Sequence, residues 1–106
     1  MEIAFQTKSL RDLCEKGDRI RRRWGDHLGE IIMARLADLR AASTVDEVVV
    51  GNPKAIIIDG APAMRLDLDE SSILVFCPNH LKVPMLSDAS VDWFAVSRIK
   101  ILKIGK

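Results

Sequence analysis

The chain has 106 residues, of which 48% are hydrophobic and 29% charged, and its 16 basic and 15 acidic residues leave a net charge of +1. This length suits a single domain over residues 1–106, and the composition is that of a folded protein rather than a disordered one. The charge balance argues against a protein with an evenly basic surface, and the lack of tyrosine excludes any mechanism that uses a tyrosine side chain.

The two cysteines and the apolar segments bear on where the protein is found. Cys14 and Cys77 stand far apart among apolar neighbours, which predicts buried free thiols rather than a disulfide framework. The start of the chain lacks the features of a signal peptide, and the longest apolar stretch, Ile73–Cys77, is far shorter than the roughly 20 residues that span a bilayer. We therefore expect a cytoplasmic protein with no membrane partner.

The first half of the chain predicts a short strand followed by helices. Ile3 and Phe5 alternate with polar residues, which indicates the strand, and Ser9 is the expected N-cap of a short helix. A longer helix is predicted from about Asp26 to Ala42, with the arginine-rich segment before it extending the first helix. The two helices should form an αα-hairpin. The apolar stripe of the longer helix consists of Leu28, Ile32, Leu36 and Leu39.

The second half changes to a strand pattern. Thr44 and Glu47 have the spacing of a capping box, which predicts one more helical turn. Strands are then expected at 54–59, 64–68, 73–77 and 96–104, with a turn at 60–62 and an extended segment at 81–86. Helices first and hairpin-connected strands later predict an α+β fold, in which an N-terminal αα-hairpin packs on an antiparallel sheet of about four strands.

Four segments in this order resemble the HigB-like (plasmid maintenance killer) branch of the RelE/ParE toxin superfamily. They are Phe5–Cys14, Arg35–Ala42, Val75–His80, and Val91–Trp93 together with Val96–Leu102. Some members of this branch carry the label of killer suppression protein. The resemblance extends over nearly the whole chain, and it implies a RelE/ParE-like toxin domain of a type II toxin–antitoxin module. It also implies a helix-turn-helix antitoxin (HigA-like) as partner and, in most active members, cleavage of mRNA on the ribosome.

Basic and imidazole side chains in the β half are the candidates for this chemistry. Backbone cleavage needs an acid, a base and cations for the developing phosphorane charge, and His80, Arg98 and Lys100 are the expected catalytic residues. A turn histidine that bonds the backbone is the alternative for His80. By the period of two, Arg98 and Lys100 should share one face of the last strand and Lys103 should point to the other. The expected RNA-binding residues are Lys54, Arg65, Lys82 and Lys103.

Four arginines form the densest positive segment of the chain and are expected to bind the partner or RNA; they are Arg19, Arg21, Arg22 and Arg23. Cys77 and His80 have the spacing of a pair of metal ligands, but two further ligands are not evident. We expect neither a metal site nor another cofactor.

Three departures from the family pattern bear on activity. Many relatives follow the last strand with a Glu-Asp-Tyr-His run that supplies catalytic groups, whereas Lys103–Lys106 contains no such residue. The turn at 59–63 lacks a cation, and Ile73 takes the place of a sheet arginine. The sequence therefore predicts an mRNA endonuclease, with two alternatives. One is a catalytically inactive RelE-like module that binds an antitoxin and regulates or suppresses a killer system, and the other is a ParE-like gyrase inhibitor.

Overall fold

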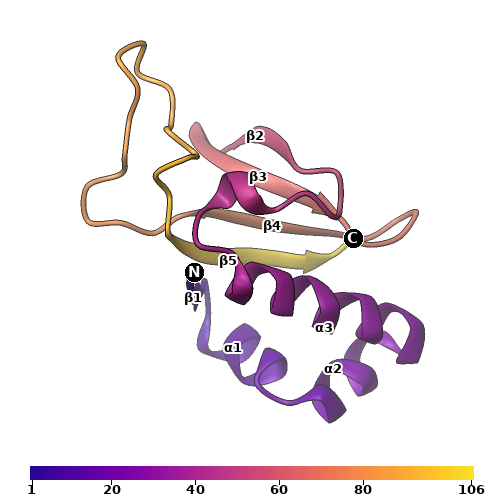
Figure 1. Cartoon of the computed structure of the whole chain (residues 1–106). Coiled ribbons are helices and arrows are strands. Elements are labelled where there is room, and N and C mark those ends of the chain that lie inside the picture. The colour runs from indigo at the N-terminus through magenta and orange to yellow at the C-terminus, as the bar shows by residue number, and fades with distance from the viewer.

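Three helices precede a run of hairpin-connected strands in the computed structural model, which describes all 106 residues (Figure 1). The helical half contains β1 (Glu2–Phe5), α1 (Lys8–Cys14), α2 (Gly17–Trp24), α3 (Asp26–Ala41) and the 3₁₀ turn η1 (Val45–Glu47). The strand half contains β2 (Lys54–Ile58), β3 (Ala61–Asp67), β4 (Ile73–Pro78) and β5 (Arg98–Gly105). The predicted α+β class is confirmed.

The strands form one five-stranded mixed sheet in the order β1-β5-β4-β3-β2. The prediction of an antiparallel sheet of about four strands is wrong in one respect, because β1 joins as a fifth strand that runs parallel to β5. Glu2 lies opposite Arg98 and Phe5 opposite Ile101 in this pair. A parallel pair requires a long connection, and the helices and the other strands lie between β1 and β5 in the chain.

The helical half has three helices rather than the predicted two, although α2 and α3 do pack as a pair, with Arg21 3.1 Å from Glu30 across the turn. The N-cap of α1 is Thr7 rather than Ser9, because the Leu10 amide donates to Thr7 Oγ1 at 3.1 Å. Lys16 is extended, with φ −130° and ψ 130°, so the arginines form α2 instead of extending α1. Gly25, with a φ of 86°, turns the chain between α2 and α3, a conformation that other residues rarely adopt.

The core lies between α3 and one face of the sheet. Ile32, Leu36 and Leu39, from the predicted stripe, are no more than 1% exposed and belong to the same buried cluster as Phe76 and Ile101. Leu28, at the start of the stripe, is partly buried against this cluster. The predicted capping box is confirmed: the Glu47 carboxylate accepts from the Thr44 amide at 3.0 Å, and the Thr44 side chain bonds back.

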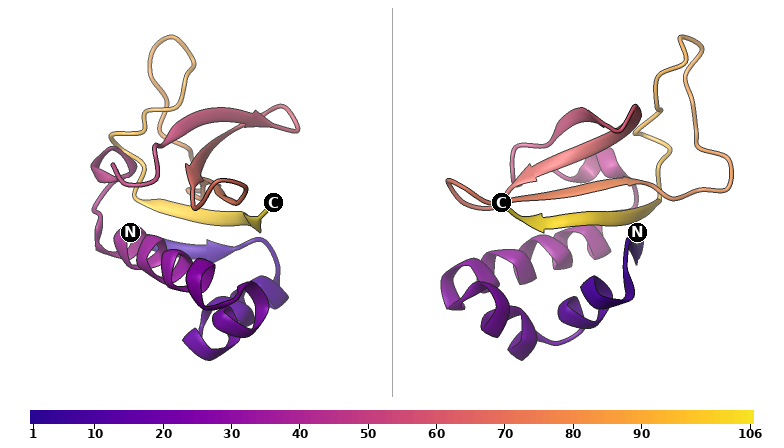
Figure 2. Two further views of the ribbon diagram at one scale, coloured as in Figure 1. Left: turned by 90° about the vertical axis from the view of Figure 1, so that its right-hand side faces the viewer. Right: turned by 180° about the vertical axis from the view of Figure 1, so that it is seen from behind.

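A long connection between β4 and β5 projects away from the helices (Figures 1 and 2). The predicted extended segment at 81–86 is not a strand, and only an isolated bridge between Met85 and Val91 orders this connection. The predicted turn at 60–62 ends earlier, since Ala61 and Pro62 already pair in β3. None of the helices combines the length and the apolar character that crossing a membrane requires.

A β-bulge in β5 determines where its lysines point. Val75 pairs with Lys103 and the next residue, Phe76, pairs with Ile101, so Leu102 is left without a partner. Lys100 lies opposite Cys77. Because Val75 and Cys77 are two residues apart on β4 and share a face, Lys100 and Lys103 share it too. The prediction that Lys103 points away from Lys100 is therefore wrong.

Candidate nucleic-acid interface

The face of the sheet opposite the core, here called the open face, carries a row of cations. Seen from behind, β3, β4 and β5 are not crossed by any helix (Figure 2, right). Lys54 pairs with Arg65, Arg65 with Val75, and Val75 with Lys103, so these residues lie side by side across four strands. At a strand spacing of roughly 4.8 Å, this series extends over about 14 Å. We call Lys54, Arg65, Lys100 and Lys103 the basic row.

A cavity of about 390 Å³ lies on the open face beside the basic row. Lys100 and Lys103 line it, together with residues of β3 and β4 and the Ile58–Asp59 end of the β2–β3 hairpin. Ala63 and Val75 also line it and are only 1% and 3% exposed, although they lie outside the main core cluster. The cavity thus has an apolar floor, with two ammonium groups and the single carboxylate of Asp59 at its margin, so its lining has a net positive charge that suits an anion with an apolar part.

The lysines of the basic row are not neutralised by the protein. All six salt bridges in the structure are made by arginines, so Lys54, Lys100 and Lys103 have no carboxylate within 4.0 Å. Arg65 differs, because its guanidinium lies 3.3 Å from the Asp67 carboxylate. Unpaired lysines on one face produce a positive field that attracts polyanions.

His80 lies next to the beginning of β5 and holds the backbone there. Its Nε2 atom accepts from the amides of Ser97 at 3.1 Å and Arg98 at 3.2 Å. These bonds place the ring proton of neutral His80 on Nδ1 and occupy the lone pair that a general base would use. This is the alternative role that the sequence left open for His80. The residue is also absent from the lining of the open-face cavity.

Two other predicted site residues, Arg98 and Lys82, do not belong to the basic row. Arg98 shares the open face with Lys100, as predicted, because the two are two residues apart on β5 before the bulge, but its Nε lies 2.9 Å from a Glu2 carboxylate oxygen. Lys82 belongs to the projecting connection and lies outside the basic row. The structure therefore places three of the four predicted RNA-binding residues on one face with two of the three predicted catalytic residues, Lys100 and Arg98, of which only Lys100 has no carboxylate partner.

Cys77 is the one thiol in the open-face cavity. Burial raises its pKa, and the nearby Lys100 lowers it by less. Burial likewise raises the pKa of Cys14, in the core, to about 11. Both side chains are thiols rather than thiolates near neutral pH, so Cys77 is not activated as a nucleophile. No group of three or more His, Cys, Asp or Glu side chains is arranged to hold a metal ion.

The arginines of α2 are partly engaged within the helical half. Arg21 lies 3.1 Å from Glu30 and 3.9 Å from Asp18, and Arg19 donates to the Asp12 carbonyl at 3.2 Å. Arg22 and Arg23 make no salt bridge, and the Arg23 guanidinium lies over the Trp24 ring at 5.4 Å. The net positive charge of this segment is therefore presented mainly by Arg22 and Arg23.

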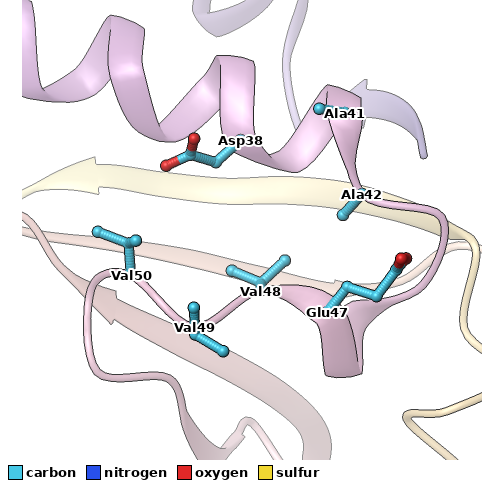
Figure 3. Close-up of a pocket in the computed structure, with 7 residues that line it drawn as sticks. All are labelled: Asp38, Ala41, Ala42, Glu47, Val48, Val49 and Val50. Atoms are coloured by element: carbon cyan, nitrogen blue, oxygen red, sulfur yellow. The ribbon is translucent and has the colours of Figure 1, made fainter.

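A second cavity, of about 330 Å³, separates the end of α3 from the segment after η1 (Figure 3). Its lining is mostly apolar, and Val49 is 75% exposed. The carboxylates of Asp38 and Glu47 lie on its margin, but Asp38 is paired with Arg35 at 3.2 Å and Glu47 serves the capping box. This cavity has no free cation and does not suit a nucleic acid.

Sequence reasoning missed the floor of the open-face cavity. The sequence places Ala63 in the predicted turn at 59–63 and Val75 in an ordinary strand, whereas the burial of both comes from the neighbouring strands. The one available signal was the interruption of strict alternation at Ile101–Leu102, where two apolar residues follow each other before Lys103. Such an interruption is typical of a β-bulge.

Comparison of the chain with protein-family models, with curated proteins and with solved structures finds no match in any of the three.

Proposed function

We propose that the chain is a toxin-like component of a type II toxin–antitoxin module, and that it binds single-stranded mRNA in the cytoplasm through the basic row. The unpaired lysines above an apolar cavity are the observation that supports RNA binding. Phosphates would lie on Lys54, Lys100 and Lys103, and an unstacked base would pack against Ile58 and Pro62, which are exposed apolar residues of the cavity lining. The toxin-like assignment itself comes from the resemblance to the RelE/ParE superfamily.

RNA binding is tested by fluorescence anisotropy with a labelled single-stranded RNA at several salt concentrations. We expect the Lys100→Gln/Lys103→Gln variant to bind roughly tenfold more weakly, because two charged contacts are lost. Its log–log salt dependence should fall by roughly 1.4, the contribution of two phosphates on a single strand. Lys82→Gln with Lys8→Gln is the matched control, since it removes the same charge away from the basic row. Equal losses in the two double variants would contradict the proposed interface.

Cleavage of mRNA on the ribosome would need His80, Arg98 and Lys100 to act together. The gene would be induced without its neighbours, and transcript ends would be mapped by primer extension. New ends that His80→Ala abolishes while RNA affinity stays unchanged would establish the endonuclease. A supercoiling assay on the same protein distinguishes gyrase inhibition.

A non-cleaving binding module is the second candidate, and the hydrogen bonds of His80 favour it. The lone pair of Nε2 is already shared by two backbone amides, so no free imidazole base faces the cavity. Such a module would bind the antitoxin, and would regulate or suppress a related killer system. Normal growth with intact transcripts, together with RNA binding, is the expected result in this case.

The proposed antitoxin partner is a helix-turn-helix protein, and we place its contact on Arg22 and Arg23 because these arginines lack carboxylate partners. An acidic segment would complement them. Co-purification with the product of the adjacent gene tests the interaction. Arg22→Gln/Arg23→Gln should weaken it, whereas Arg19→Gln/Arg21→Gln should do so less, because those arginines already have partners.

A further inference from the structure

A separate cavity of about 390 Å³ lies where the end of α2 meets the end of β5, apart from the open-face cavity. Trp24, Leu28 and Ile104 form its apolar wall, and Arg23 and Lys106 supply two cations. None of its lining side chains is acidic. A volume of this order is that of a small-molecule site.

Two polar groups of this cavity, the Arg23 guanidinium and the Trp24 indole N–H, have no hydrogen-bond or salt-bridge partner within the chain. Arg23 forms no salt bridge, although its neighbour Arg21 forms two. The Arg23 guanidinium is held over the Trp24 ring, 5.4 Å from its centre, which leaves its N–H edge available. The Trp24 indole nitrogen faces Gly105, where an added Cβ would lie 3.5 Å away, and no hydrogen bond within the protein uses it.

We propose that this cavity binds a nucleoside monophosphate, either free or at the end of an RNA. The phosphate would accept from Arg23, Lys106 and the Trp24 indole N–H. The planar base would pack on the Arg23 guanidinium and the apolar wall, since guanidinium planes stack on bases. The proposal does not rest on RNA binding at the basic row, because the cavity shares no residue with it.

NMR of the natural chain provides a direct test. The chain has two tryptophans, so a ¹H–¹⁵N spectrum contains two indole signals, which the Trp93→Phe variant assigns. Addition of adenosine 5′-monophosphate should shift the Trp24 signal saturably and leave that of Trp93 in place. Adenosine without phosphate should bind roughly tenfold more weakly, as loss of a charged hydrogen-bond partner predicts.

Two adjacent arginines provide the matched variants. Arg23→Gln should weaken binding roughly tenfold, whereas Arg22→Gln, on the same helix but outside the cavity lining, should change it less than about twofold. Lys103→Gln should also have little effect, which separates this site from the basic row. Circular dichroism of Arg23→Gln confirms that the variant is folded.

The two sources of the ligand are distinguished by a short RNA with and without a 5′-phosphate. A shift of the Trp24 signal with adenosine 5′-monophosphate supports a free nucleotide as the ligand. A shift only with the phosphorylated RNA supports the end of an RNA chain. In each case Arg23→Gln should remove the shift. No shift of the Trp24 signal with any of these probes, or equal losses in Arg22→Gln and Arg23→Gln, would overturn the proposal.

Discussion

The two faces of the sheet are built from alternating residues of the same strands, yet one face is apolar and buried and the other is charged and uncovered. On the core face, Leu74, Phe76 and Ile101 are fully buried under α3 and the η1 segment. On the open face, Lys54, Arg65 and Lys103 lie across the same strands with no layer above them. Because successive side chains of a strand point to opposite faces, the residues that stabilise the fold lie on one face and the charged residues on the other. Substitutions on one face should therefore have little effect on the other.

The largest expected effect comes from the core face. Phe76→Ala should lower the free energy of unfolding by about 3–5 kcal/mol, because it leaves a cavity at the centre of the sheet. Val75→Ala, on the adjacent position of the open face, is the control and should cost less than half as much. Urea denaturation measures both. Similar costs for the two variants would show that the open-face floor contributes as much to stability as the core.

Substitution of His80 measures how much its two hydrogen bonds to the start of β5 contribute to stability. His80→Ala leaves the Ser97 and Arg98 amides without their acceptor, and we expect a loss of about 1–2 kcal/mol in the free energy of unfolding. Lys82→Ala in the same connection should change it by less than about 0.5 kcal/mol. If His80→Ala were as stable as the natural chain, the imidazole would be free for another role.

Substitution of Glu2 tests whether a carboxylate at the edge of the open face weakens RNA binding. Its carboxylate lies 2.9 Å from Arg98, so it competes with any phosphate for that guanidinium. Both side chains are exposed, and such a pair contributes roughly 0.2–1 kcal/mol. We expect Glu2→Gln to raise RNA affinity about two- to fivefold in the anisotropy assay. Glu70→Gln, in the turn between β3 and β4, makes the same change in net charge and should raise it less.

The smallest expected effect concerns the turn that keeps β3 and β4 in register. Hydrogen bonds, first from the Ser71 amide at 2.9 Å, lower the pKa of Asp69. A lowered pKa in the folded state adds stability above the unfolded value of about 3.9, and this stability is lost as pH falls below it. Asp69→Asn should therefore make the acid side of a stability–pH profile less steep. Glu70→Gln is the control, and an unchanged profile for Asp69→Asn would contradict the linkage.

Much of the fold follows from local sequence. The apolar stripe of α3, the capping box at Thr44 and Glu47, and the four later strands are all recognisable without coordinates, because each depends on residues close together in the chain. The basic residues of the open face are recognisable as candidates for the same reason. Their identity was predictable, whereas their arrangement was not.

The tertiary structure decided what depends on distant partners. The alternation of Ile3 and Phe5 predicts a strand, but it does not predict that β1 pairs parallel to β5. That pairing depends on how the three helices and the other strands pack between them in the chain. The bulge at Leu102 arises from the register between β4 and β5, and it turns Lys103 toward Lys100. The hydrogen bonds of His80 depend on the return of the chain at Ser97 and Arg98, seventeen and eighteen residues later. Composition and periodicity thus determined which residues could bind an anion, and cross-strand register decided which of them meet.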